Sequence, residues 1–234
     1  MNTFRSKGIF WGLMALTSIF VMAFGFRAVR NGTAMNISDI YAIAVFDAIL
    51  IGLIIPGVSL LVIKEVDGWM VSSKLLAFNS RSMWWMEVKK RLLGNCFASA
   101  VIIILPVFLL ANIFSETTRT AAEWVYMLFL FLSYFVYFYL LALLISIVEI
   151  KFHQNLLAVS FAFLISFLPN ILAFLFRQSG IPTISGLLNL SYAMDNGSFF
   201  WLRCGKVCML MLLLLALLEK AGMVLLKKQD IFWK

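Results

Sequence analysis

Six long apolar stretches, separated by more polar segments, dominate the hydrophobic pattern of the chain. They cover residues 9–26, 40–63, 95–114, 124–148, 156–176 and 207–226. A helix of about 20 apolar residues crosses the roughly 30 Å hydrocarbon core of a bilayer. The pattern therefore predicts an all-α integral membrane protein with six transmembrane helices, folded as a single transmembrane domain over residues 1–234.

The first stretch has two alternative interpretations, because Arg5 and Lys7 precede it as they would in a secretory signal peptide. It is long for the apolar region of a signal peptide, and it lacks a convincing small-x-small cleavage site. We therefore expect it to remain in the protein as the first span.

Two segments between the spans are long enough to carry structure of their own. In residues 64–94, the part from Ser82 to Leu92 places Trp84, Trp85, Val88 and Leu92 on one helical arc and charged residues on the other. This predicts an amphipathic helix at the membrane interface, with its tryptophans at headgroup depth.

The second such segment, residues 177–206, mixes turn formers with the apolar patch Ile184 to Tyr192. The patch is too short to span, so it predicts a re-entrant or outer hairpin between the fifth and sixth helices. Four asparagines on the same side begin N-x-S/T triplets: Asn31, Asn36, Asn189 and Asn196. We interpret these triplets as chance matches rather than glycosylation sites.

Composition supports a membrane location and excludes a soluble domain. Hydrophobic residues make up 63% of the 234 positions and charged residues 13%. A soluble domain of this size cannot bury so much apolar surface. The net charge of +8 suggests nucleic acid as a partner, but no block of Lys and Arg is interleaved with stacking aromatic residues on a soluble element. We therefore predict membrane lipid, and no nucleic acid, as the surroundings of this chain.

Loop charges predict the orientation. With the N-terminus in the cytoplasm, 13 of the 19 Lys and Arg residues lie on the cytoplasmic side and the other six outside. Cytoplasmic loops are enriched in these residues. Arg27 and Arg30, directly after the first span, are exceptions that do not reverse the bias. We therefore predict that both termini are cytoplasmic.

Catalytic and metal sites are not predicted. The chain has one histidine, His153, in the short loop that begins at Glu149, and a single imidazole cannot form a two-histidine metal site. The cysteines Cys96, Cys204 and Cys208 are odd in number and lie in or beside apolar runs, so we expect packing thiols. No P-loop motif is present, so this chain is not expected to bind and split a nucleotide through one. No cofactor is predicted for this chain.

Polar side chains inside the spans are the candidates for a translocation path. Ionisable groups in a bilayer are costly and are functional hypotheses by default. The candidates are Asp47, Tyr134, Tyr137 and Glu219. For Asp47 we favour a structural hydrogen bond or an outward-facing vestibule over a proton relay. We expect a neighbouring helix to hold Glu219.

Residues 64–90 contain Glu65, Gly68, Leu75-Leu76, Ser80-Arg81 and Lys89 or Lys90 in that order. The order resembles the cytoplasmic loop of the type-2 permease subunits of ATP-binding-cassette (ABC) transporters. The tail Lys227-Lys228-Gln229-Asp230-Ile231 is similar to the basic-Asp-Ile ending of that family. Six spans and an outer hairpin before the sixth extend the resemblance over nearly the whole chain.

The resemblance implies a short cytoplasmic coupling helix between the second and third spans, here Val66 to Phe78, on which a separate ATPase acts. The side chains that would fill a groove on the ATPase are Trp69, Met70, Leu75 and Leu76. Glu65 and Arg81 would make charged contacts at its rim, and Gly68 belongs to the family pattern. The alternative for this loop is a connector that lies on lipid and docks nothing.

Membership of this family implies a permease subunit of an exporter in the bacterial cytoplasmic membrane. It would pair with a second copy or a similar permease and with ABC ATPase subunits that bind ATP. Amphiphilic peptides are the implied substrate class, including bacteriocins in self-immunity. The alternative functions are an intramembrane enzyme, such as a protease or lipid hydrolase, and a stand-alone secondary carrier.

Overall fold

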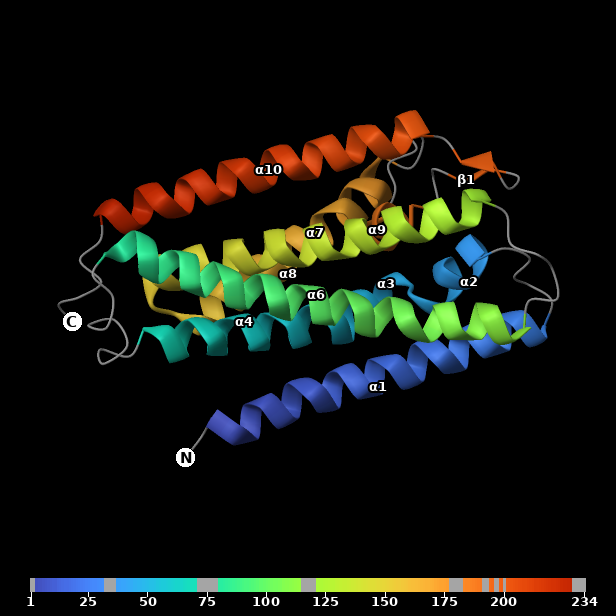
Figure 1. The fold of residues 1–234 in the computed structure, drawn as a ribbon, viewed down its shortest axis with the longest axis horizontal. Coiled ribbons are helices and arrows are strands. Elements are labelled where there is room, and N and C mark those ends of the chain that lie inside the picture. The colour runs from blue at the N-terminus through green and yellow to red at the C-terminus, as the bar shows by residue number, and fades with distance from the viewer. Residues whose placement is uncertain are drawn as a thin grey trace.

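The long helices of the chain lie roughly side by side in a bundle (Figure 1). The computed structural model describes residues 3–31, 37–70, 80–114, 121–176, 183–190, 194–195, 198–199 and 201–228. The long helices are α1 (Thr3–Arg30), α4 (Ile55–Trp69), α6 (Arg81–Phe114), α7 (Ala121–Phe152), α8 (Asn155–Leu175) and α10 (Trp201–Lys228). Shorter elements are α2 (Ile37–Ala44), α3 (Asp47–Ile49), the π-helix η1 (Leu50–Ile54), α9 (Ile184–Leu188), β1 (Met194–Asp195) and β2 (Ser198–Phe199).

Six segments of the described chain are helical, long and apolar enough to cross a membrane. They are Trp11–Arg30, Asp47–Trp69, Ser82–Leu109, Glu123–Phe152, Asn155–Leu175 and Cys204–Leu225. Apart from the two-residue antiparallel ribbon β1–β2, the described secondary structure is helical. The architecture is that of a multi-pass membrane protein, as the apolar pattern predicts.

Helix α7 is the centre of the bundle, because it packs against α4, α6, α8, α9 and α10. Its side chains Leu130, Tyr134 and Phe138 are fully buried. By contrast, α8 and α10 leave most of their Leu, Phe and Met side chains exposed. Such exposure is favourable in lipid and unfavourable in water, so the two helices form a membrane-facing edge of the bundle.

The second span is not the continuous helix over residues 40–63 that the apolar run predicts. The chain breaks at Val45 and Phe46, where Phe46 is extended (φ −88°, ψ 169°). The helix then restarts as α3, passes through the π-turn η1 and continues as α4 as far as Trp69. Pro56 lies in the first turn of α4, where its missing N–H and its ring disturb the preceding turn and favour the π geometry.

The predicted interfacial helix Ser82–Leu92 is also corrected, because these residues are the first turns of the continuous helix α6. Trp84, Trp85, Val88 and Leu92 share one arc as expected, but all four are buried in protein. The arc packs against neighbouring helices instead of lipid headgroups. The third span therefore begins about a dozen residues earlier than the predicted start at residue 95.

The turn after α7 is shorter than predicted. Helix α7 runs through Phe152, so Glu149 lies inside the helix and is buried, rather than in a loop. His153 is exposed and adopts a left-handed backbone conformation (φ 52°), which reverses the chain into α8 within two residues. The surface position predicted for this histidine is confirmed.

Both chain ends lie at the same end of the bundle, where α1 begins and α10 ends (Figure 1). We call this the terminal end. The last turn of α4, the first turn of α6 and the α7–α8 turn also lie there, whereas α2, α9 and the β-ribbon lie at the opposite, distal end (Figure 1). The even number of spans accounts for this arrangement, because each crossing reverses the chain.

A glycine lets α10 approach the bundle near the terminal end. A Cβ atom at Gly222 would lie 3.1 Å from Cζ2 of Trp85 and 3.5 Å from Ile147. We expect Gly222→Val to destabilise the fold by about 1–3 kcal/mol through overpacking. Gly205→Val, in the same helix, is the matched control, since nothing lies within 4 Å of its Cβ position. Unfolding of the purified variants in detergent measures the difference, and equal stability would contradict the close packing.

Candidate functional site

The last turn of α4 holds the first of the predicted coupling residues at the terminal end. The indole Nε1 of Trp69 donates to Oε1 of Glu65 at 3.1 Å, one helical turn away. Met70 ends the helix, and its N–H donates to the carbonyl of Val66 at 2.9 Å. Gly68 has open space around its Cβ position. The predicted coupling residues up to Met70 thus belong to the end of the second spanning helix.

The first turns of α6 bond directly to this last turn of α4. Ser80 caps α6, since its Oγ accepts from the N–H of Met83 at 3.2 Å. The Trp84 indole donates to the backbone carbonyl of Trp69 at 2.9 Å, and the Arg91 guanidinium lies 5.9 Å above the Trp69 ring. Carbonyls in the last turn of a helix lack partners within it, so Trp84 satisfies one of them. We call Trp69, Trp84 and Arg91 the tryptophan clamp.

The remaining predicted coupling residues are described only in part. Leu75 and Leu76 lie within residues 71–79, outside the described residues. Arg81 begins α6, but its side chain is not described. The predicted coupling helix Val66–Phe78 overlaps α4 over Val66–Trp69, so these four residues do not begin a separate helix. The clamp therefore flanks the 71–79 segment on both sides.

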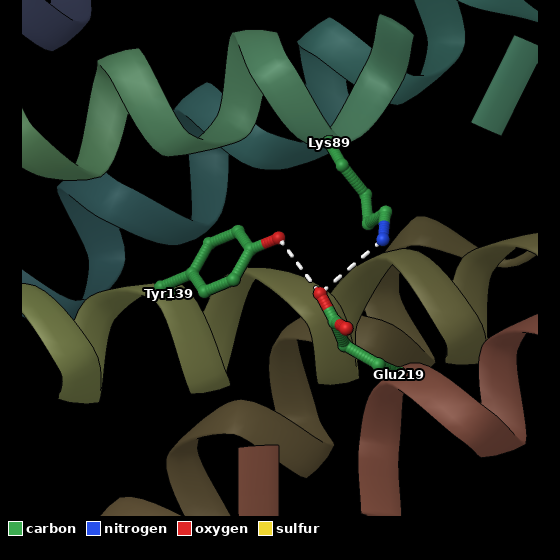
Figure 2. Close-up of polar contacts among 3 residues, drawn as sticks. All are labelled: Lys89, Tyr139 and Glu219. Atoms are coloured by element: carbon green, nitrogen blue, oxygen red, sulfur yellow. Dashed lines mark hydrogen bonds and ion pairs between the residues drawn. The ribbon is translucent and has the colours of Figure 1, made fainter. Parts of the chain in front are cut away.

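An ion pair holds α10 to the rest of the bundle (Figure 2). Oε1 of Glu219 accepts from Nζ of Lys89 at 3.3 Å and from the Tyr139 hydroxyl at 3.4 Å. Glu219 belongs to α10, Lys89 to α6 and Tyr139 to α7. The expectation that a neighbouring helix holds Glu219 is confirmed. A carboxylate in a span needs such partners, because an unpaired charge there is costly.

Asp47 and Tyr134 meet the short helix α9 at the distal end. Oδ1 of Asp47 accepts from the backbone N–H of Ser185 at 2.8 Å, and Oδ1 of Asn170 in α8 accepts from that of Ile184 at 2.8 Å. The first N–H groups of a helix have no partner inside it. Side chains from two spanning helices therefore satisfy them. The hydrogen-bonding role favoured for Asp47 matches this geometry.

Asn189 is the centre of a buried polar network at the distal end. Its Oδ1 accepts from the Tyr134 hydroxyl at 2.5 Å, and its backbone carbonyl accepts from Tyr126 at 2.5 Å. Its Nδ2 donates to the carbonyls of Val45 at 3.0 Å and Tyr41 at 3.3 Å. The Val45 carbonyl lies at the break between α2 and α3, so the Asn189 side chain supplies a hydrogen bond that the broken helix cannot.

The sequence interpretation did not select Asn189, Tyr126 or Tyr41. A usable signal was present, because Asn189 is an amide inside an apolar patch too short to span, and such a group needs partners. Of the four candidate path residues, the structure brings Asp47 and Tyr134 together around α9. The other two candidates, Tyr137 and Glu219, have different partners. Tyr137 bonds to Ser166 of α8 at 2.6 Å, and Glu219 lies in the ion pair with Lys89.

Ligands for a metal or cofactor are scarce in the described part of the chain. No group of three or more His, Cys, Asp or Glu side chains there is close enough to hold a metal ion. Cys96, Cys204 and Cys208 are free, and the first two are buried. The arrangement is suited to a mechanical role, because hydrogen bonds join helix ends at both ends of the bundle.

Comparison with known proteins found no match. No family model, no curated protein and no solved structure matches the chain. Function is therefore argued from the residues and their geometry.

Loss of the Asn189 side chain is expected to loosen the distal end. Asn189→Leu removes the partners of the Tyr134 hydroxyl and the Val45 carbonyl, and a buried polar group without a partner costs about 1–3 kcal/mol. The matched control is Asn112→Leu, because Asn112 is exposed and its amide donates within α6, to the Phe108 carbonyl. Unfolding in detergent should show a loss of about 2 kcal/mol for the first variant and almost none for the second. Equal effects would show that Asn189 is not the centre of the network.

Proposed function

We propose that this chain is the permease subunit of an ABC exporter and that separate ATPase subunits bind and hydrolyse ATP on its behalf. The observation that carries the proposal is the tryptophan clamp beside residues 71–79. This segment contains Leu75 and Leu76, which match the residue order of the permease family. It connects α4 to α6, and the clamp joins the same two helices.

The clamp provides what a coupling segment requires physically. A permease without a nucleotide site must receive a force from outside, and a segment transmits force only if its two attachment points move together. The Trp84–Trp69 hydrogen bond and the Arg91–Trp69 contact fix the end of α4 to the start of α6. A force on residues 71–79 then moves both helices as one unit.

Transport in this proposal takes place between two permease copies, either a homodimer or a pair with a second, similar permease. Closure of the ATPases on ATP moves the coupling segments and opens a path lined by apolar and aromatic side chains. Such a lining suits amphiphilic peptides, including bacteriocins in self-immunity. Asp47 and Tyr134, bonded to α9, hold the distal end closed at rest.

The proposal requires the terminal end to face the cytoplasm of a bacterium. The clustering of Lys and Arg in the segments at that end supports this orientation. We expect a reporter fused after Phe114 to be active outside the cytoplasmic membrane and one fused after His153 to be active inside. Paired alkaline phosphatase and fluorescent protein fusions measure this, and the reverse pattern would overturn the proposal.

Association with an ATPase is the central test. The full chain, purified from its native membrane, should bring with it a protein that carries a P-loop and hydrolyses ATP, identified by mass spectrometry and an ATPase assay. We expect Leu75→Asp with Leu76→Asp to reduce the recovered ATPase at least tenfold, since two charges cannot enter an apolar groove.

The matched control is Ser72→Asp with Ser73→Asp, which adds the same charge to the same segment and keeps both leucines. Unchanged recovery of the ATPase with the leucine variant would reject the coupling role of this segment. Transport by the purified chain alone, driven by an ion gradient and indifferent to ATP, would reject the permease function altogether.

A further inference from the structure

An apolar pocket lies between α7 and α10, at the membrane-facing edge of the bundle. Its volume is about 170 Å³, and its lining includes Leu132, Ser133 and Val136 of α7 and Met211 and Leu212 of α10. Leu132 is 39% exposed and Leu212 is 54% exposed, so these two side chains form an open rim. Helix α10 lies along the outside of the bundle (Figure 1), so an occupant would enter this pocket from the lipid phase.

One polar side chain of the lining is buried and has no partner. Ser133 is 2% exposed, and its Oγ atom forms no hydrogen bond with a described residue. Seven other Ser and Thr side chains of the spanning helices donate to the carbonyl four residues earlier. On α7 itself, Ser146 donates to the carbonyl of Ala142 at 2.7 Å. Ser133 departs from this pattern at a place where its helix borders a pocket.

Water is a poor partner for this hydroxyl group. Ser133 follows Glu123, the first residue of the span, by ten residues, which is about 15 Å along a helix. It therefore lies near the middle of a hydrocarbon core of roughly 30 Å. A buried water needs about two to four polar partners, and besides Ser133 the described side chains of the lining offer only the Cys208 thiol. An organic occupant fits better.

The volume and the hydroxyl group together define the occupant. An apolar cavity of about 150 Å³ accommodates a benzene molecule, so this pocket takes one ring or a group of similar size. A plain hydrocarbon would leave the Ser133 hydroxyl without a partner, and a buried polar group without a partner is destabilising. A ring that carries a hydroxyl group avoids this cost, because a serine hydroxyl both donates and accepts.

We propose that the α7–α10 pocket binds a phenol, that is, a benzene-sized ring whose hydroxyl group forms a hydrogen bond with Ser133. The ring packs against Val136 of α7 and Met211 of α10, whose flexible thioether adapts to an aromatic edge. A change of the Ser133 χ1 angle is enough to direct its hydroxyl group at the ligand.

The site has a consequence for transport under the proposed permease function. A tyrosine side chain of an amphiphilic peptide carries the phenol that the pocket fits, so the pocket would receive such a side chain from the lipid. This consequence rests on the proposed function, whereas the binding of a phenol does not.

Binding of para-fluorophenol and fluorobenzene to the full chain in lipid nanodiscs tests the site without any ATPase. Fluorine NMR measures both affinities, with empty nanodiscs as the reference for partition into lipid. The wild type should bind para-fluorophenol saturably and about fivefold more tightly than fluorobenzene, which is the effect of one hydrogen bond.

Three variants and a cross-linking probe locate the site. Ser133→Ala should weaken para-fluorophenol about fivefold and leave fluorobenzene unchanged. Ser146→Ala is the matched control, because Ser146 is also buried in α7 but bonds to Ala142 and does not line the pocket. Val136→Phe should fill the pocket and weaken both compounds at least tenfold. A phenol with a diazirine group should cross-link to residues 129–136 and 208–212.

Any of three results would overturn the proposal. The first is equal affinity of the wild type for the two compounds, since the pocket would then take any apolar group, including an acyl chain. The second is an equal effect of Ser133→Ala and Ser146→Ala, a comparison that holds even if Val136→Phe does not fold. The third is cross-linking confined to other helices. None of these results bears on recovery of the ATPase, so failure of this proposal is distinguishable from failure of the permease function.

Discussion

The structure depends on one constraint, namely that the backbone polar groups of a chain in lipid must find partners within the protein. The break at Val45 and Phe46 violates the simplest solution, an unbroken helix, and leaves the Val45 carbonyl to be paired from elsewhere. Asn189 supplies that partner from a segment more than a hundred residues away. The position of α9 follows from this requirement, because Asn189 reaches the break only if the segment after α8 folds back into the bundle.

The tyrosines of α7 show how a mainly apolar bundle becomes specific. All four donate hydroxyl hydrogen bonds to other elements: Tyr126 and Tyr134 to Asn189, Tyr137 to Ser166 of α8, and Tyr139 to Glu219 of α10. Between helices that contact one another through interchangeable apolar surfaces, such bonds select one rotation and register. Through these hydroxyl groups the tyrosines link α7 to its neighbours.

The number of spans was predictable, because a run of about 20 apolar residues has few other solutions. The break in the second span was not predictable, because residues 40–63 stay apolar across the break and the stabilising Asn189 is remote in sequence. Residues 82–92 were misassigned for a related reason. Their charges at Glu87 to Arg91 interrupt the apolar run, but they occupy one arc while Trp84 and Trp85 are buried on the other. Periodicity identifies the buried arc, but not whether protein or lipid covers it.

The second span connects the two ends of the bundle, and its irregularity has a mechanical consequence under the proposed function. Asp47, at its distal end, bonds to Ser185 of α9, and Trp69, at its terminal end, belongs to the tryptophan clamp. A regular helix between them would transmit a displacement with little loss. The π-turn η1 intervenes, and such turns are places where a helix changes direction. A force on residues 71–79 would therefore turn α4 about η1 before it strains the Asp47 bond. The distal network around Asn189 would therefore be the last part of the bundle to be strained.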